Sequence, residues 1–293
     1  MHFPALTLVA CMALLAAITS LWLRSAAWMA ALAAALVLGY AAGVMHGPAA
    51  AWVAALGLLV WAYRRNKSSS RGRGVRAVLL ALGIVAVATL LGMHALPGFD
   101  NPLLVDNLVI GPGATAYSVY FNFDKTMVGI LLIGFGSTAL LRSAAQWRLA
   151  LRRAAPVIAV NVIAAMLLAV ALGFVELQPK WTSLFWSWAL VNLLLTCLSE
   201  EAFFRGFIQQ EVGAALSGHR FGDAAAIATS AVLFGIAHVA GGWRYVLLAT
   251  LAGAGYAIVY RRTRSIEMAM LAHFTLNSVH FLLFTYPRLA QPA

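Results

Sequence analysis

The sequence predicts an all-α protein, a polytopic bundle of transmembrane helices. Of its 293 residues, 63% are hydrophobic and only 10% are charged, whereas soluble domains carry about 25% charged residues. So few polar side chains cannot cover a water-facing surface, and lipid is therefore the expected solvent. The apolar residues are also gathered into long segments, with the basic residues in short runs between them.

Each transmembrane helix needs about 20 mostly apolar residues. Ten segments meet this requirement or come close to it: 4–23, 26–45, 48–63, 77–97, 127–141, 155–176, 186–205, 223–243, 244–260 and 265–285. The third and the fifth are short enough to be only partly embedded. We therefore expect eight to ten spans.

The net charge of +11 would suggest nucleic acid binding in a soluble protein. Here the basic residues lie in the stretches 64–76, 142–154, 206–222 and 261–264, which share one side of the membrane if the helices alternate in direction. Basic loops of this kind are typical of the cytoplasmic side. We expect no nucleic acid partner, both termini on the outer side, and an exterior loop at 98–126.

The stretch 98–126 also marks a predicted boundary, because the chain changes character there. The four predicted helices before it contain no acidic residue, and all candidate chemistry lies after residue 185. We therefore predict that residues 1–126 form accessory N-terminal transmembrane helices with an exterior loop. Residues 127–293 are predicted to form the functional core.

Two adjacent glutamates, Glu200 and Glu201, lie in the seventh predicted helix. Ionisable groups at membrane depth cost several kcal/mol, so they usually line a cavity and serve a function. On an α-helix, Glu201 and Arg205 share a face and can form an ion pair, which would fix local geometry. Glu200 lies about 100° away round the helix and is expected to have no such partner, so it is the candidate acid or base. The alternative is that both glutamates simply cap the cytoplasmic helix end.

Polar residues also interrupt two later apolar helices. His238 follows Phe234 by four residues in the eighth segment, and His273 and Asn277 are four apart on one face of the last. A neutral histidine and an asparagine side by side can both donate hydrogen bonds to a developing oxyanion. Taken singly, a histidine such as His238 is more often a packed, hydrogen-bonded residue than a catalytic one. His273 and Asn277, taken singly, fit a hydrogen bond between helices equally well. Together with Glu200 they supply the parts of a water-activating hydrolase.

These residues form three motifs, in order on separate helices, that resemble those of the CPBP family of CAAX-processing endopeptidases and Abi-group bacteriocin-processing proteins: Glu200-Glu201-xxx-Arg205, Phe234-xxx-His238 and His273-xxx-Asn277. The resemblance covers residues 155–285. It makes residues 127–293 a CPBP-like intramembrane protease core, with the catalytic cavity among the C-terminal helices and open to the cytosol.

The resemblance implies a role for each motif residue. Glu200 and His238 would activate the attacking water, and His273 and Asn277 would hold the oxyanion. The substrate would be a membrane-embedded or lipidated polypeptide, cut near its C-terminus. Glu201, Arg205 and Phe234 are expected to support the site.

The same resemblance brings a second view of the chemistry, because the family has also been described as metal-dependent. The sequence has no His-Glu-x-x-His pair, the usual sign of a zinc protease, so we expect no cofactor. If a divalent metal such as zinc were bound, Glu200, His238 and His273 would be its ligands.

Other functions fit the sequence less well. A non-catalytic bacteriocin-immunity or peptide-binding membrane protein is the main alternative, since some family members have such roles. A proton-coupled transporter would be expected to show inverted repeats, and the acid-free first helices argue against one. The alanine- and arginine-rich composition favours a bacterial protein, which we expect in the inner (cytoplasmic) membrane.

Overall fold

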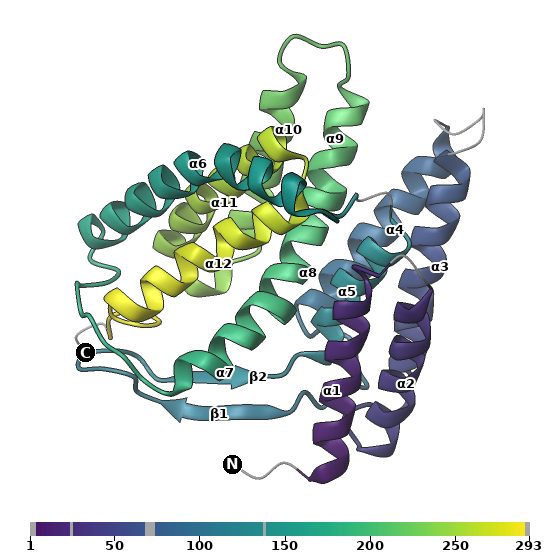
Figure 1. Cartoon of the computed structure of the whole chain (residues 1–293), viewed down its shortest axis with the longest axis horizontal. Coiled ribbons are helices and arrows are strands. Elements are labelled where there is room, and N and C mark those ends of the chain that lie inside the picture. Colours follow the sequence, from purple (N-terminus) through teal and green to yellow (C-terminus); the bar gives the residue numbers. More distant parts are fainter. Residues whose placement is uncertain (1–3, 24–25, 68–73, 137–138, 291–293) are drawn as a thin grey trace. The chain divides into compact units, whose positions relative to one another are not determined.

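The structure is a computed structural model that describes residues 4–23, 26–67, 74–136 and 139–290 (Figure 1). Residues 68–73, part of the predicted basic loop, lie outside the described residues. The helices and strands, in chain order, are α1 (Ala5–Ser20), α2 (Ala27–Ala41), α3 (Ala49–Lys67), α4 (Val75–Gly92), β1 (Leu103–Leu108), β2 (Tyr117–Tyr120), α5 (Phe123–Gly134), α6 (Ala144–Ala171), α7 (Leu184–Val191), η1 (Asn192–Cys197), α8 (Leu198–Glu201), η2 (Ala202–Gln209), α9 (Gln210–Ala215), α10 (Gly222–Ile236), η3 (Val239–Gly241), α11 (Trp243–Thr263) and α12 (Ile266–Leu283).

The predicted helical membrane bundle is confirmed. Three helices are long and apolar enough to cross a membrane, namely α4, α6 and α12, and α1, α2 and α10 are shorter apolar helices; these findings cover the described residues. Of the apolar windows, that of α4 is 17% buried and that of α12 is 50% buried. Exposed apolar side chains on α4 suit contact with lipid, whereas half of the α12 window is buried inside the protein.

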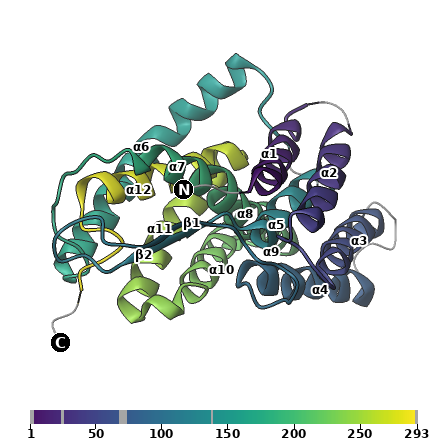
Figure 2. The same cartoon turned by 90° about the horizontal axis from the view of Figure 1, so that it is seen from below.

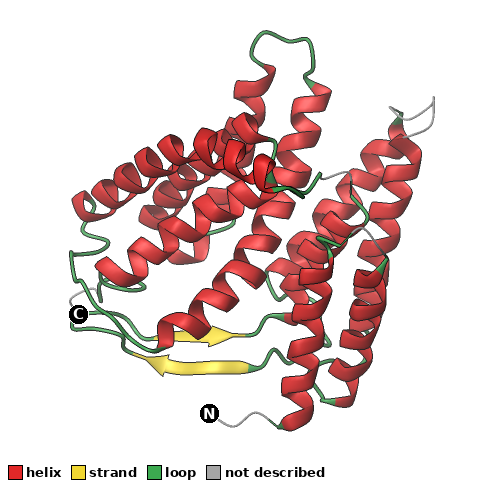
Figure 3. Cartoon of the chain, viewed as in Figure 1, coloured by secondary structure: helices red, strands yellow, loops and turns green. Residues whose placement is uncertain are grey.

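Several predicted boundaries were wrong. The sixth segment was predicted to begin at residue 155, whereas α6 begins at Ala144. The stretch 98–126 is not only a loop, because it contains the two-stranded sheet of β1 and β2 and the start of α5 (Figure 3). The seventh helix does not end at residue 205, since helical elements follow one another from Leu184 to Ala215. The eighth ends at Ile236 instead of residue 243.

The described chain divides into two compact units. Unit 1 comprises 1–104, 120–138 and 194–203, and unit 2 comprises 105–119, 139–193 and 204–293. The predicted boundary at residue 126 stays a prediction.

In unit 1 the core helix is α5. It contacts α1, α3, α4 and α8, and nearly every side chain from Phe123 to Ile133 is buried. Such a helix, apolar all round, is expected only at the centre of a bundle. Lys125 is the exception on it, as an only partly buried cation.

In unit 2 the central helix is α11, which contacts α6, α10 and α12, while α6 also contacts α12 (Figure 2). The start of α12 is fixed by its own sequence. Ser265 Oγ accepts a hydrogen bond from the Met268 N–H at 3.1 Å and donates one to Glu267 Oε2 at 2.7 Å. Glu267 Oε1 accepts from the Leu141 N–H at 2.6 Å. This N-cap sets the register of the helix that carries His273.

Candidate active site

The two glutamates lie in unit 1, on the single turn α8 between the π-helical stretches η1 and η2. π-turns are rare and occur often at functional sites. Glu201 is fully buried, with 0% of its surface exposed. The expectation that Glu200 lacks a partner was wrong, because Lys125 Nζ donates to Glu200 Oε1 at 2.6 Å.

The helix that carries Lys125 is fitted closely to α8. A side chain at Gly129 would place its Cβ 3.0 Å from Leu198 Cγ and 3.1 Å from Ser199 Cα, so a larger residue here would require these neighbours to shift by a few tenths of an ångström. Beside Lys125, Asp124 is 2% exposed. Its carboxylate accepts from Asn101 Nδ2 at 2.9 Å and lies 2.7 Å from His94 Nδ1. These bonds anchor the first turn of α5.

In unit 2 a cavity of about 70 Å³ collects the other predicted catalytic side chains. Its volume is enough for a few water molecules. The lining residues are Ala165, Met166, Ala169, Phe174, Val175, Phe234, His238, Tyr245, Leu248, Ala249, Ala252, Tyr256, His273, Leu276, Asn277 and His280. His238, His273 and Asn277 therefore lie around one cavity, as the sequence predicted, together with Phe234. Glu200 and Glu201 belong to unit 1.

His238 is held in one orientation by the residue four positions before it. Its Nδ1 lies 2.7 Å from the Phe234 carbonyl oxygen, which can only accept a hydrogen bond. Nδ1 therefore carries the proton, and Nε2 is the ring atom able to accept one. His238 was expected inside the eighth helix, but it lies in the turn after α10, with its backbone N–H bonded to the Gly235 carbonyl.

His273 and Asn277 lie on α12. The His273 ring stacks on Tyr256 with centroids 4.7 Å apart and meets the Phe234 ring edge-on at 5.6 Å. Asn277 Nδ2 donates to Asn192 Oδ1 at 3.2 Å. That bond joins two helices, as the alternative interpretation expected, and it also fixes the direction of the Asn277 amide at the cavity.

Arg205, with 0% of its surface exposed, supports the same aromatic group. Its Nη2 donates to the Gly253 carbonyl at 2.8 Å. The guanidinium lies 4.6 Å from the centre of the Phe234 ring and 5.2 Å from that of Tyr256, within the range of cation–π attraction. The Glu201–Arg205 ion pair stays a prediction. Its spacing argument assumed an α-helix, whereas η2 begins at Ala202.

Several residues of this region were not predicted from the sequence. Asn192 could have been predicted from the sequence, because a polar amide in an apolar helix usually forms a hydrogen bond with a neighbouring helix. Tyr256 looked like an ordinary aromatic residue. Lys125 gave no signal, because it lies 75 residues from Glu200 in the chain. Among the described residues, no group of three or more His, Cys, Asp or Glu side chains is placed to hold a metal ion.

The region that contains the three motifs matches a known protein family. The family model described as type II CAAX prenyl endopeptidase Rce1-like matches residues 180–279, which confirms the resemblance to the CPBP family. The matched residues contain all three motifs and Asn192. By this match, the stretch is similar to the CAAX-type intramembrane endopeptidases, a class of proteases. Neither the curated proteins nor the solved structures gave a match.

Proposed function

Because residues 180–279 match the Rce1-like family, we propose that this protein is an intramembrane endopeptidase of the glutamate type. It hydrolyses a peptide bond near the C-terminus of a membrane-embedded or lipidated polypeptide. We place it in the bacterial cytoplasmic membrane, on the composition of the chain. The observation that supports this best is the cavity at which His238, from the turn after α10, meets His273 and Asn277 from α12.

The proposed reaction begins at a water molecule. His238 Nε2 accepts a hydrogen bond from that water, and the Glu200 carboxylate removes a proton from it as it attacks the scissile carbonyl carbon. The Lys125 ammonium beside Glu200 Oε1 favours the ionised carboxylate that a base needs. The proton then passes from Glu200 to the leaving amine nitrogen as the C–N bond breaks.

The tetrahedral oxyanion is stabilised on α12. His273 and the Asn277 amide donate to it, and donors of this kind contribute about 3 kcal/mol each in other hydrolases. Asn192 holds the amide with its oxygen at 3.2 Å, so the donor is oriented before the substrate binds. Phe234 and Arg205 support the site, since the Phe234 carbonyl orients His238 and Arg205 packs on the Phe234 ring.

The test uses the source cells, because the substrate is unidentified. Cells expressing Glu200→Gln in place of the natural protein are compared with wild type by mass spectrometry of the C-terminal peptides of membrane proteins. We expect at least one membrane polypeptide to keep its C-terminal segment in the variant. Glu211→Gln, an acid-to-amide change later in the same helical stretch, should leave that polypeptide processed.

The alternative function has a different outcome in the same experiment. If no C-terminus changes while the Glu200→Gln protein reaches wild-type levels in the membrane, the proposed proteolysis is refuted. If the variant also retains protection against a bacteriocin, the protein acts by binding alone.

A further inference from the structure

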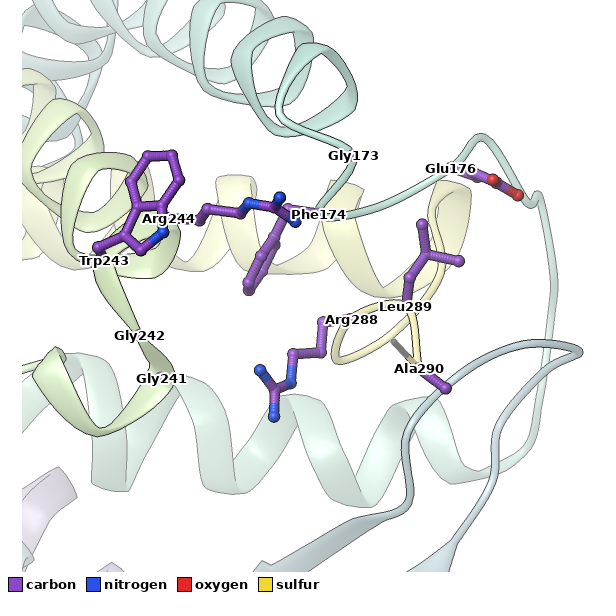
Figure 4. Close-up of a pocket in the computed structure, with 10 residues that line it drawn as sticks. All are labelled: Gly173, Phe174, Glu176, Gly241, Gly242, Trp243, Arg244, Arg288, Leu289 and Ala290. Carbon is purple, nitrogen blue, oxygen red and sulfur yellow. The ribbon is translucent and has the colours of Figure 1, made fainter. Parts of the chain in front are cut away.

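A second and larger cavity of unit 2 has no part in the proposed reaction. It measures about 400 Å³, which is within the usual range for small-molecule sites. Figure 4 shows the residues around it, which come from the chain just after α6, from the start of α11 and the residues before it, and from the chain after α12. The lining residues are Gly173, Phe174, Glu176, Gly241, Gly242, Trp243, Arg244, Arg288, Leu289 and Ala290.

Two arginines make this cavity electropositive. Within the described part of the chain, neither Arg244 nor Arg288 has an ion pair or a side-chain hydrogen bond; Arg244 only packs over Trp243, 5.6 Å from the ring. Glu176 also lines the cavity, but Figure 4 shows its carboxylate turned away from both guanidinium groups. Two unpaired guanidiniums at one cavity suit an anion with a planar pair of oxygens.

The arginine cavity, as we call this second cavity, shares an aromatic lining residue with the histidine cavity, our name for the cavity of about 70 Å³ lined by His238, His273 and Asn277. Phe174 lines both cavities and stacks on Tyr245, with centroids 5.6 Å apart and planes 6° apart. Tyr245 in turn meets the His238 ring edge-on at 5.1 Å. On the main chain, the Gly241 N–H at the arginine cavity donates to the His238 carbonyl at 3.0 Å. The two cavities are therefore neighbours, joined by these aromatic contacts and this main-chain hydrogen bond.

We propose that the arginine cavity binds the C-terminal carboxylate of the polypeptide substrate. This inference rests on the proposed function, because cleavage near a C-terminus leaves a short segment that ends in a carboxylate. Arg244 and Arg288 bind that carboxylate. Trp243, Phe174 and Leu289 present apolar surface to the last side chains. The position of the cleaved bond is thus set by its distance from the C-terminus of the substrate.

The test measures binding apart from cleavage. The full-length protein, in nanodiscs of phosphatidylcholine, is mixed with an apolar tripeptide that carries a benzophenone side chain, either as the free acid or as the C-terminal amide. After irradiation, mass spectrometry measures the yield of adducts on the segments that line the arginine cavity. We expect at least about tenfold more labelling by the acid, the size expected for charge-assisted hydrogen bonds.

Variants separate the arginines from other effects. Arg244→Gln with Arg288→Gln should reduce labelling by the acid to the level of the amide. Arg244→Lys with Arg288→Lys keeps both charges and should lose only part of the preference for the acid over the amide. This result would exclude a folding defect as the cause of the loss in the double Gln variant. Arg220→Gln is the matched control, because Arg220 likewise packs over its neighbouring aromatic, Phe221, at 4.9 Å, and it should label as wild type.

The outcomes are distinguishable from those of the proteolysis test. Equal labelling by acid and amide, or a preference that survives in the double Gln variant, overturns the inference even if proteolysis is established. Loss of labelling when phosphatidylglycerol is added to the nanodiscs identifies an anionic lipid site and overturns it as well. Labelling that persists in Glu200→Ala supports the carboxylate site whether or not hydrolysis occurs.

Discussion

Lys125 Nζ lies 2.6 Å from Glu200 Oε1, and both side chains are largely buried, with 17% and 12% of their surfaces exposed. A buried ion pair is a weak source of net stability, but the loss of one partner leaves the other charge uncompensated. We therefore expect Lys125→Met to lower the free energy of unfolding by about 3 kcal/mol. Chemical unfolding of the purified protein in detergent measures this change.

The double variant Lys125→Met with Glu200→Gln should recover much of that loss, because neither charge remains. Lys67→Met is the control, since Lys67 is exposed at the end of α3, and it should leave stability near that of wild type. A double variant less stable than both single variants would contradict the ion-pair interpretation.

The second prediction concerns the oxyanion donors. Asn277→Ala should lower kcat by about 100- to 1,000-fold, as the loss of an oxyanion donor does elsewhere. Asn192→Ala removes the acceptor that orients Asn277, so we expect a loss of about three- to tenfold, the size of one ordinary hydrogen bond. Both values are measured once the natural substrate is known. An Asn192→Ala enzyme as impaired as Asn277→Ala would assign Asn192 a direct role.

A third prediction tests the packing of unit 2. A Cβ at Gly255 would lie 2.0 Å from Asn161 Cγ, and the Asn161 amide is buried and donates to the Ala252 carbonyl at 3.2 Å. Gly255→Ala should therefore destabilise the protein by about 1–3 kcal/mol through overpacking. Thermal unfolding in detergent measures the effect.

The matched substitution for that experiment is Gly213→Ala in α9. There the added Cβ would meet Ala226 Cβ at 3.7 Å, an ordinary contact. We expect no loss, or a gain of up to about 1 kcal/mol from better helix propensity. Equal destabilisation at both glycines would rule out the steric explanation.

The fourth prediction concerns Lys180, which lies between α6 and α7. Burial lowers the pKa of this lysine from its ordinary value of 10.5. The unfolded chain therefore binds more protons between the folded and the unfolded pKa, and stability should rise as the pH rises through that interval. We expect the unfolding temperature of the wild type to rise relative to that of Lys180→Gln as the pH is raised through this interval. Parallel curves for the two proteins would contradict it.

The sequence was sufficient for the features that depend on local pattern. The apolar segments predicted helices, and the spacing of Phe234 with His238 and of His273 with Asn277 predicted residues that the fold gathers at one cavity. The sequence did not predict the ion pair of Lys125, because its partner, Glu200, lies 75 residues away in the chain. Nor did it reveal the short strands β1 and β2, which lie in a stretch where turn residues dominate.

Two π-helical stretches, η1 and η2, bracket the turn that carries the glutamates. A π-turn bonds residues five apart instead of four, so each stretch holds more residues per turn than an α-helix. Deleting one residue from 193–195 would remove the extra residue that η1 accommodates, so the stretch could return to the α-helix with Glu200 still directed toward Lys125. The direction in which these glutamates point thus does not depend on that extra residue. A one-residue deletion there should be tolerated better than the same deletion in the α-helix α5, where it would rotate the following residues by about 100°.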